Sequence, residues 1–174
     1  VRPGVMKKIA PVAGKQGTVE EFKVDFTPED MNVTIKEVVK DTKKAVDITE
    51  AKVLVSGGRG IGSPEFFGEL KKVADLLGGE ISSSRANVDA GWIERDRQVG
   101  QTGKTVRPEL YMACGISGAI QHIAGMENSE CVISINKNDT AAIFDVSDLG
   151  IVGDVKVIIP KLIDALTKYK AAQN

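Results

Sequence analysis

The feature that most constrains the fold is an alternation of short apolar runs with helical patterns, which begins near Asp47. Nearly continuous apolar runs occupy residues 52–58, 109–115 and 131–137, and a weaker run occupies residues 79–84. Short runs of this kind are typical of strands that are buried on both faces. Because they alternate with helical patterns, the sequence predicts an α/β fold, a doubly wound and mainly parallel sheet with helices on both faces.

Three helical patterns complete this alternation. Residues 63–79 combine a serine cap, a proline in the first turn and a terminal glycine, which together predict one helix. Its apolar face is predicted to comprise Phe66, Phe67, Leu70, Val73, Ala74 and Leu77. The other two patterns predict a short helix over residues 118–126 and a closing helix over residues 153–172.

Residues 1–46 follow a different pattern. Apolar and polar residues alternate over residues 18–26 and 32–40, and Pro28 and Asp30 separate the two stretches. This alternation predicts extended segments with one solvated face and no compact domain of their own. We therefore divide the chain into an extended segment, residues 1–46, and a folded domain, residues 47–174.

Composition excludes several classes of function. The 23 basic and 24 acidic residues nearly cancel, so no basic excess is present to neutralise a nucleic-acid backbone. No apolar run approaches the roughly 20 residues that span a bilayer, so no membrane insertion is expected. Cys114 and Cys131 lie in apolar runs without a CxxC spacing, which predicts buried free thiols and no metal site. Unpaired thiols favour the cytoplasm or an organelle matrix.

Ligands of doubly wound sheets bind where the carboxyl ends of the strands meet. The first such loop, SGGRGIGS at residues 56–63, offers backbone N–H groups, a helix N-terminus and the guanidinium of Arg59. It lacks the dinucleotide fingerprint G-x-G-x-x-G and the P-loop lysine, so it is either an anion site or a tight turn. Arg85 follows the neighbouring strand, and two arginines at adjacent strand ends favour an anion between them.

Two further stretches are polar at positions where a core needs no polar groups. The loop over residues 98–106 carries glutamine, threonine and lysine on a glycine-rich backbone, and it is either solvated or ligand-binding. His122, the only histidine, is either a packed side chain or a source of a proton or charge for a ligand. No nucleophile–base pair or carboxylate pair is evident, and Ser117 lies outside a G-x-S-x-G frame. The residues therefore predict a large polar ligand that carries the chemistry itself.

Several segments occur in a recognisable order: VSGGRGIGS, SSRANVDAGW, VGQTGKTVRPELYMACGISGAIQHIAGM, ISINKNDTAAIF and DLGIVGDV. Together they resemble the FAD-binding half of the alpha subunit of electron transfer flavoproteins, over roughly residues 50–170. The stretch QTGKTVRPELYMACGISGAIQH is the most specific part. The resemblance implies that residues 47–174 are a Rossmann-like FAD-binding domain and that residues 1–46 are an inter-domain segment. It also implies that the N-terminal domain of the family is missing from the chain.

The resemblance further implies FAD as the cofactor and a heterodimer with a beta subunit. The implied function is that of an electron carrier, not an enzyme, which shuttles electrons from acyl-CoA or other flavin dehydrogenases to a redox acceptor. Some members of the family bifurcate electrons with NADH. The implied location is the bacterial cytoplasm or the mitochondrial matrix, with the cytoplasm favoured. Two alternatives stay open: a NAD-binding dehydrogenase domain, and a nucleotide-binding regulatory module without a redox role.

The family motifs also imply roles for individual residues. Arg59 would lie by the FAD diphosphate, Arg85 beside the isoalloxazine ring, and the hydroxyl of Thr102 toward the flavin N5 atom. His122 would approach the flavin O2 atom, where a donor or cation favours the negative charge that reduction creates. The implied cofactor-binding set is Arg59, Ser84, Arg85, Val99, Gly100, Gln101, Thr102, Ser117, Gly118, Ala119, Ile120, Gln121, His122 and, toward the adenosine end, Asn136, Asp154 and Val155.

Overall fold

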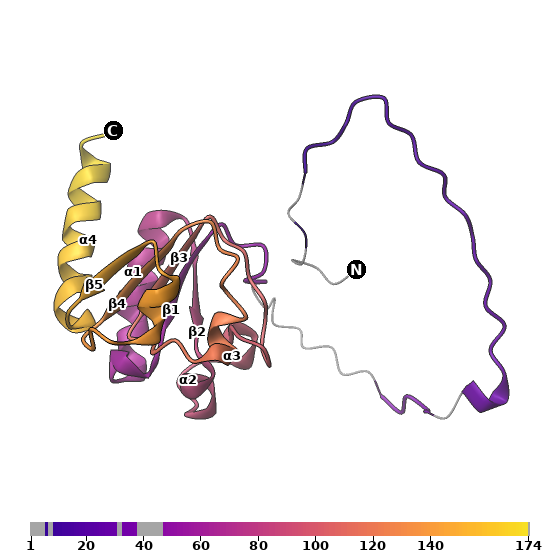
Figure 1. Cartoon of the computed structure of the whole chain (residues 1–174), viewed down its shortest axis with the longest axis horizontal. Coiled ribbons are helices and arrows are strands. Elements are labelled where there is room, and N and C mark those ends of the chain that lie inside the picture. Colours follow the sequence, from indigo (N-terminus) through magenta and orange to yellow (C-terminus); the bar gives the residue numbers. More distant parts are fainter. Residues whose placement is uncertain (1–5, 7–8, 31–32, 38–46, 174) are drawn as a thin grey trace. The chain divides into compact units, whose positions relative to one another are not determined.

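The computed structural model describes residues 6, 9–30, 33–37 and 47–173 (Figure 1). The chain divides into two units, one within residues 7–45 and one that contains residues 47–173. The second unit holds the sheet, all the α-helices of the described residues and the candidate site.

The described residues of the first unit form no strand, and their one regular element is a 3-10 turn, η1 (Pro28–Asp30). Apolar members of the alternating pattern are exposed, including Phe22 at 89% and Ile35 at 75%. The described residues of the predicted extended segments, 18–26 and 33–37, belong to no strand, and both faces of the alternating pattern are exposed. Residues 32 and 38–40 of the predicted pattern lie outside the described residues. The role of residues 1–46 as an inter-domain segment stays a prediction.

The second unit is built on a five-stranded parallel sheet with the order β2-β1-β3-β4-β5. The strands are β1 (Val53–Gly57), β2 (Glu80–Ser83), β3 (Leu110–Cys114), β4 (Val132–Asn136) and β5 (Leu149–Val152). The predicted α/β fold is confirmed, with the first four strands at the expected places. Because β2 is added on one side of β1 and β3 on the other, the strand order reverses between β1 and β3. Such a reversal is where doubly wound sheets bind ligands.

Four α-helices accompany the sheet. They are α1 (Phe67–Leu77), α2 (Arg85–Asp89), α3 (Ile120–Ile123) and α4 (Val155–Ala171). The helix predicted over residues 63–79 begins as a 3-10 turn, η3 (Pro64–Phe66), and ends as expected at Gly78, whose φ of 70° is left-handed. The predicted short helix is confined to the four residues of α3.

The two faces of the sheet are covered differently. Helices α1 and α4 lie side by side on one face, where they bury Val55, Met112 and Ile135 (Figure 1). The other face buries Tyr111 against apolar residues of the loop over residues 98–106, of the segment around α3 and of a 3-10 turn, η5 (Ala142–Val146). In the part of the chain that the structure describes, no helix has the length and apolar character needed to cross a bilayer.

Candidate functional site

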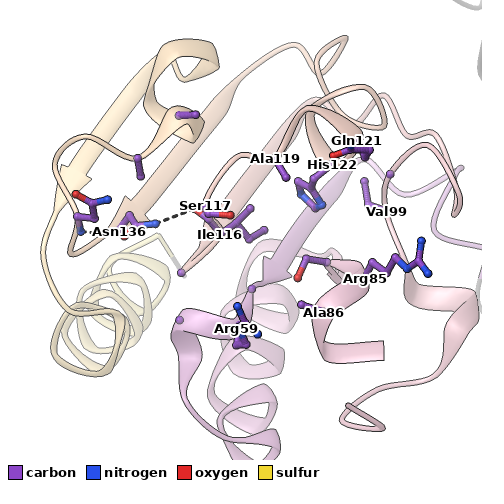
Figure 2. Close-up of a pocket in the computed structure, with 18 of the residues that line it drawn as sticks. Arg59, Arg85, Ala86, Val99, Ile116, Ser117, Ala119, Gln121, His122 and Asn136 are labelled. Atoms are coloured by element: carbon purple, nitrogen blue, oxygen red, sulfur yellow. Dashed lines mark hydrogen bonds between the residues drawn. The ribbon is translucent and has the colours of Figure 1, made fainter. Parts of the chain in front are cut away.

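A pocket of about 780 Å³ lies at the carboxyl edge of the sheet (Figure 2). It is lined by residues that follow each of the five strands and by the loop that begins at Gln98. A volume of this size is within the range of small-molecule and cofactor sites. The sequence prediction that the polar loops converge at this edge is therefore correct.

The loops that follow β1 and β3 meet at the strand reversal with their backbones in contact. The Gly58 amide donates to the Cys114 carbonyl at 2.9 Å, and the Gly60 amide donates to the Gly115 carbonyl at 3.0 Å. A Cβ atom on Gly58 would lie 2.3 Å from the Gly115 oxygen, so a side chain there would separate the two loops. Glycine at these positions thus lets the two loops form one continuous surface of the pocket.

Of the residues that the sequence implied, all except Gly118 and Ile120 line the pocket. Gly118 has a φ of 88°, and a Cβ atom on it would lie 2.2 Å from the backbone nitrogen of Ile143 in η5. The Ile120 side chain is 81% exposed. These two residues therefore serve the local turn and the surface instead of the pocket lining. Contact of the remaining residues with FAD stays a prediction.

Two arginines follow the adjacent strands β1 and β2. Arg59 starts the 3-10 turn η2 (Arg59–Ile61), and Arg85 starts α2. Both line the pocket, and the Arg85 Nε atom also lies 3.1 Å from a carboxylate oxygen of Asp89 on the surface (Figure 2). Guanidinium groups bind phosphate oxygens in pairs of hydrogen bonds, so this side of the pocket suits a phosphate or diphosphate.

The hydroxyl of Thr102 is oriented by a buried neighbour. Gln98 is 4% exposed, and its side-chain nitrogen donates to the Thr102 Oγ1 atom at 3.0 Å. Because the oxygen accepts this bond, the hydroxyl proton of Thr102 remains to be donated elsewhere. The loop itself is fixed against α3, since the Gln101 amide donates to the Gln121 carbonyl at 2.7 Å. Thr102 therefore offers a hydrogen-bond donor on the pocket side of the loop.

His122 is 6% exposed and belongs to the pocket lining. Its Nε2 atom lies 3.0 Å from the Tyr111 hydroxyl, and its buried Nδ1 atom has no hydrogen-bond partner among the described residues. Burial lowers the pKa of His122 to about 4, and the nearby Val99 carbonyl opposes this shift only in part. The imidazole is therefore neutral at pH 7. Of the two roles that the sequence left open, donor or cation, the structure favours the neutral donor.

At the other side of the pocket, two predicted residues have structural bonds of their own. Asn136 donates to the Ile116 carbonyl at 2.8 Å and accepts from the Asn138 amide at 2.9 Å. Asp154 caps α4, with one carboxylate oxygen accepting from the Lys156 amide at 2.8 Å. Their place in the lining is thus fixed by the ends of β4 and α4.

Several residues that line the pocket are absent from the cofactor-binding set that the family motifs imply. They are Gly58, Gly60, Ala86, Gln98, Gly115, Ile116, Lys137, Asn138, Thr140, Ala141, Ala142 and Gly153. The sequence held a signal for Asn138, which lies two residues after the end of β4 and whose side chain accepts from the Thr140 amide at 3.2 Å. Asparagine in such a turn marks a loop at a strand end. Among the described residues, no group of His, Cys, Asp and Glu could hold a metal ion.

Comparison with known families gives a match for most of the domain that carries this pocket. The sequence pattern of the family described as electron transfer flavoprotein FAD-binding domain matches residues 47–127. The chain belongs to this electron transfer flavoprotein family. FAD is accordingly the cofactor for which this domain is named, which confirms the cofactor expected from the sequence.

Relatives extend the similarity beyond the matched residues. The chain is 54% identical over 170 residues to the electron transfer flavoprotein subunit alpha of Thermoanaerobacterium thermosaccharolyticum, covering 98% of this chain and 52% of the relative. It is 51% identical over 177 residues to the corresponding subunit of Clostridium acetobutylicum, covering 100% and 52%. A protein of Anaerotignum propionicum named acryloyl-CoA reductase electron transfer subunit beta is 48% identical over 178 residues, covering 99% and 48%. The chain thus spans about half the length of these curated relatives.

The pocket of this electron transfer flavoprotein domain fits FAD in four respects. Its volume lies in the range of cofactor sites, and it lies at the strand reversal. Arg59 supplies donors for a diphosphate, and Arg85 supplies a second cation in the same lining. The unpartnered Nδ1 atom of His122 is a buried polar atom that a flavin heteroatom could satisfy.

Proposed function

We propose that the chain is the FAD-binding part of an electron transfer flavoprotein alpha subunit and acts as an electron carrier without turning over a substrate of its own. The observation that carries this proposal is the pocket at the strand reversal, lined from all five strands. The proposal is also supported by relatives that are named as electron transfer subunits. FAD, when bound, supplies the redox chemistry.

The proposed role of the chain is to bind, orient and shield the cofactor. Arg59 binds the diphosphate, and Arg85 lies beside the flavin ring. Thr102 donates its hydroxyl proton toward the flavin N5 atom, in keeping with the bond that its oxygen accepts from Gln98. His122 donates toward the flavin O2 atom as a neutral imidazole.

The remaining implied contacts extend the cofactor across the sheet edge. Asn136, Asp154 and Val155, which line the pocket, are proposed to bind the adenosine end. Val99, Gly100 and Gln101 cover the flavin from the neighbouring loop. The backbone from Ser117 to Gln121 follows the ribityl chain.

The partners belong to the same proposal. A beta subunit completes the carrier, which accords with relatives that are named as subunits and are about twice as long as this chain. The electron donor is a flavin dehydrogenase that acts on an acyl-CoA, a class supported by the relative named as an acryloyl-CoA reductase electron transfer subunit. We place this activity in the cytoplasm, and an electron-bifurcating system is one setting in which the carrier operates.

Titration of the chain with FAD tests the proposal. We expect one FAD to bind per chain, detected by quenching of flavin fluorescence, and the bound form to pass electrons from a reduced flavin dehydrogenase to an acceptor. Arg59→Ala removes charged hydrogen bonds worth about 1.5–3 kcal/mol, so the Kd for FAD should rise roughly 10- to 100-fold. Arg95→Ala is the matched control, because Arg95 is also exposed but lies outside the pocket lining. Failure to bind FAD, both alone and with a beta subunit, would overturn the proposal.

A further inference from the structure

Tyr111 is a buried polar residue that the function proposed above does not use. It lies in β3 with no exposed surface, and its hydroxyl is 3.0 Å from the Nε2 atom of His122. The pocket lining includes His122 but not Tyr111. Any influence of Tyr111 on a bound ligand therefore acts through the histidine.

The surroundings of the phenol decide the direction of its hydrogen bond. Ser56 in β1 and Ser82 in β2 are opposite each other in the sheet register and fully buried. Their hydroxyls act on the Tyr111 oxygen and lower its pKa against the rise that burial causes, without forming bonds of normal geometry. Neither serine hydroxyl has another partner among the described residues. The Nε2 atom of His122 is the one hydrogen-bond partner that the described residues give the phenol, so the single proton of the phenol is directed to this nitrogen.

The Nδ1 atom, on the other side of the His122 ring, is also consistent with this direction of the hydrogen bond. Nδ1 has no hydrogen-bond partner among the described residues, so no bond made at that atom opposes a proton on it. The position of the proton on a neutral imidazole is set by the bond that the other nitrogen makes.

We propose that Tyr111 is a positioning residue, which donates to Nε2 of His122 and thereby fixes the imidazole proton on Nδ1 as a donor to bound FAD. This inference rests on the proposed function only for the identity of the acceptor. The tautomer itself is a property of the chain and can be measured without the cofactor.

Nitrogen NMR of the full chain tests the tautomer directly, since His122 is the only histidine and gives a single set of ring signals. At pH 7 we expect a protonated Nδ1 and an unprotonated Nε2. Tyr111→Phe keeps the ring in the core but removes the donor, so both nitrogens should shift toward the averaged values of a tautomer mixture. Ser56→Ala should produce a smaller shift in the same direction, because it removes one of the two hydroxyls acting on the phenol.

The chain offers a matched control in its second tyrosine, Tyr169, which is 63% exposed in α4. Tyr169→Phe should leave the ring nitrogens of His122 unchanged. A parent chain that carries its proton on Nε2, or a Tyr111→Phe chain with the parent pattern, would overturn the assignment.

Binding then separates this inference from the proposed function. Without the Tyr111 hydroxyl, the Nδ1–H group of His122 is no longer fixed and about one hydrogen bond to FAD is lost. Tyr111→Phe should therefore raise the Kd for FAD about tenfold. If FAD does not bind the parent chain or its complex with a beta subunit, the proposed function fails while the tautomer result stands. If FAD binds the parent and Tyr111→Phe with equal affinity, the positioning role is wrong and the proposed function survives.

Discussion

His122 shows how burial at the scale of one residue decides chemistry. Its glycine-rich setting gave two possibilities, an inert side chain or a group that interacts with a ligand. The structure has the ring 6% exposed, bonded through Nε2 to Tyr111, with Nδ1 unpartnered and buried. A buried neutral imidazole can donate a hydrogen bond but cannot supply a charge without paying for its desolvation. The residue is thus better suited to orient a cofactor than to attract an anion.

The low pKa of His122 makes folding stability depend on pH. The group titrates near pH 4 in the folded chain and near 6.5 when unfolded, so the unfolded chain binds the extra proton first as the pH falls. We expect the free energy of unfolding to be independent of this group above about pH 7 and to fall by about 3 kcal/mol toward pH 4. Urea unfolding at several pH values measures this slope.

The matched variant for this prediction is His122→Gln, which cannot titrate. Its stability should vary much less between pH 6.5 and 4.5 than that of the parent. Carboxylates such as Asp47, whose pKa is lowered by its hydrogen bonds to Thr49 and Lys104, add their own loss only below about pH 4. Equal slopes in the parent and His122→Gln within this window would show that His122 is not desolvated as described.

At the scale of elements, the sequence predicts best the strands that are mostly buried. Strands β1, β3 and β4 were predictable because most residues of each are buried. β5 was missed because it is an edge strand in which Leu149 is 52% exposed and Val152 is 60% exposed. α2 was missed because it is little more than one turn and buries only Asn87.

The position of the candidate site could also be predicted from the sequence, but its individual contacts could not. Its position at the strand ends follows from topology, so the loops were predictable as a group. The contacts of single residues within a loop were harder to predict, because successive side chains of residues 115–122 point in different directions. Ser117 and Ala119 line the pocket, whereas Gly118 between them packs on η5 and Ile120 faces outward. A motif that is contiguous in sequence therefore overstates the contacts that one side of a turn can make.

The contact between the loop over residues 98–102 and the end of α3 gives a prediction at this scale. A Cβ atom on Gly125 would lie 2.4 Å from the Gly100 backbone nitrogen and 2.5 Å from its Cα atom. Gly125→Ala should therefore push the loop away, lower the free energy of unfolding by about 1–3 kcal/mol, and weaken FAD binding. Thermal unfolding and FAD titration measure the two effects.

Gly68 provides the control for this substitution. It is exposed within α1, and a Cβ atom there would meet nothing within 4 Å. Gly68→Ala should raise stability by about 0.5–1 kcal/mol through helix propensity and leave FAD affinity unchanged. If Gly125→Ala behaves like Gly68→Ala, the loop does not depend on the close backbone contact.

At the scale of the whole domain, the pocket connects loops from every strand of the sheet. Residues after β4 and β5 lie at one side of the strand reversal, while α3 follows β3 and the loop beginning at Gln98 pairs with Ser83 of β2. The implied orientation of FAD assigns its adenosine end to the first group and its flavin to the second. A ligand that contacts only one group should therefore stabilise only part of the sheet edge.

Hydrogen exchange with FAD and ADP tests this orientation. A ligand present at one hundred times its Kd stabilises the folded state by about 2.7 kcal/mol, which is enough to slow amide exchange measurably. We expect ADP to protect residues 137–142 and 153–155 but not residues 99–102 and 119–122, because ADP lacks the flavin. FAD should protect all four stretches together. Protection of residues 99–102 by ADP would reverse the assigned direction of the cofactor, and FAD protection confined to one stretch would show that no single extended ligand occupies the pocket.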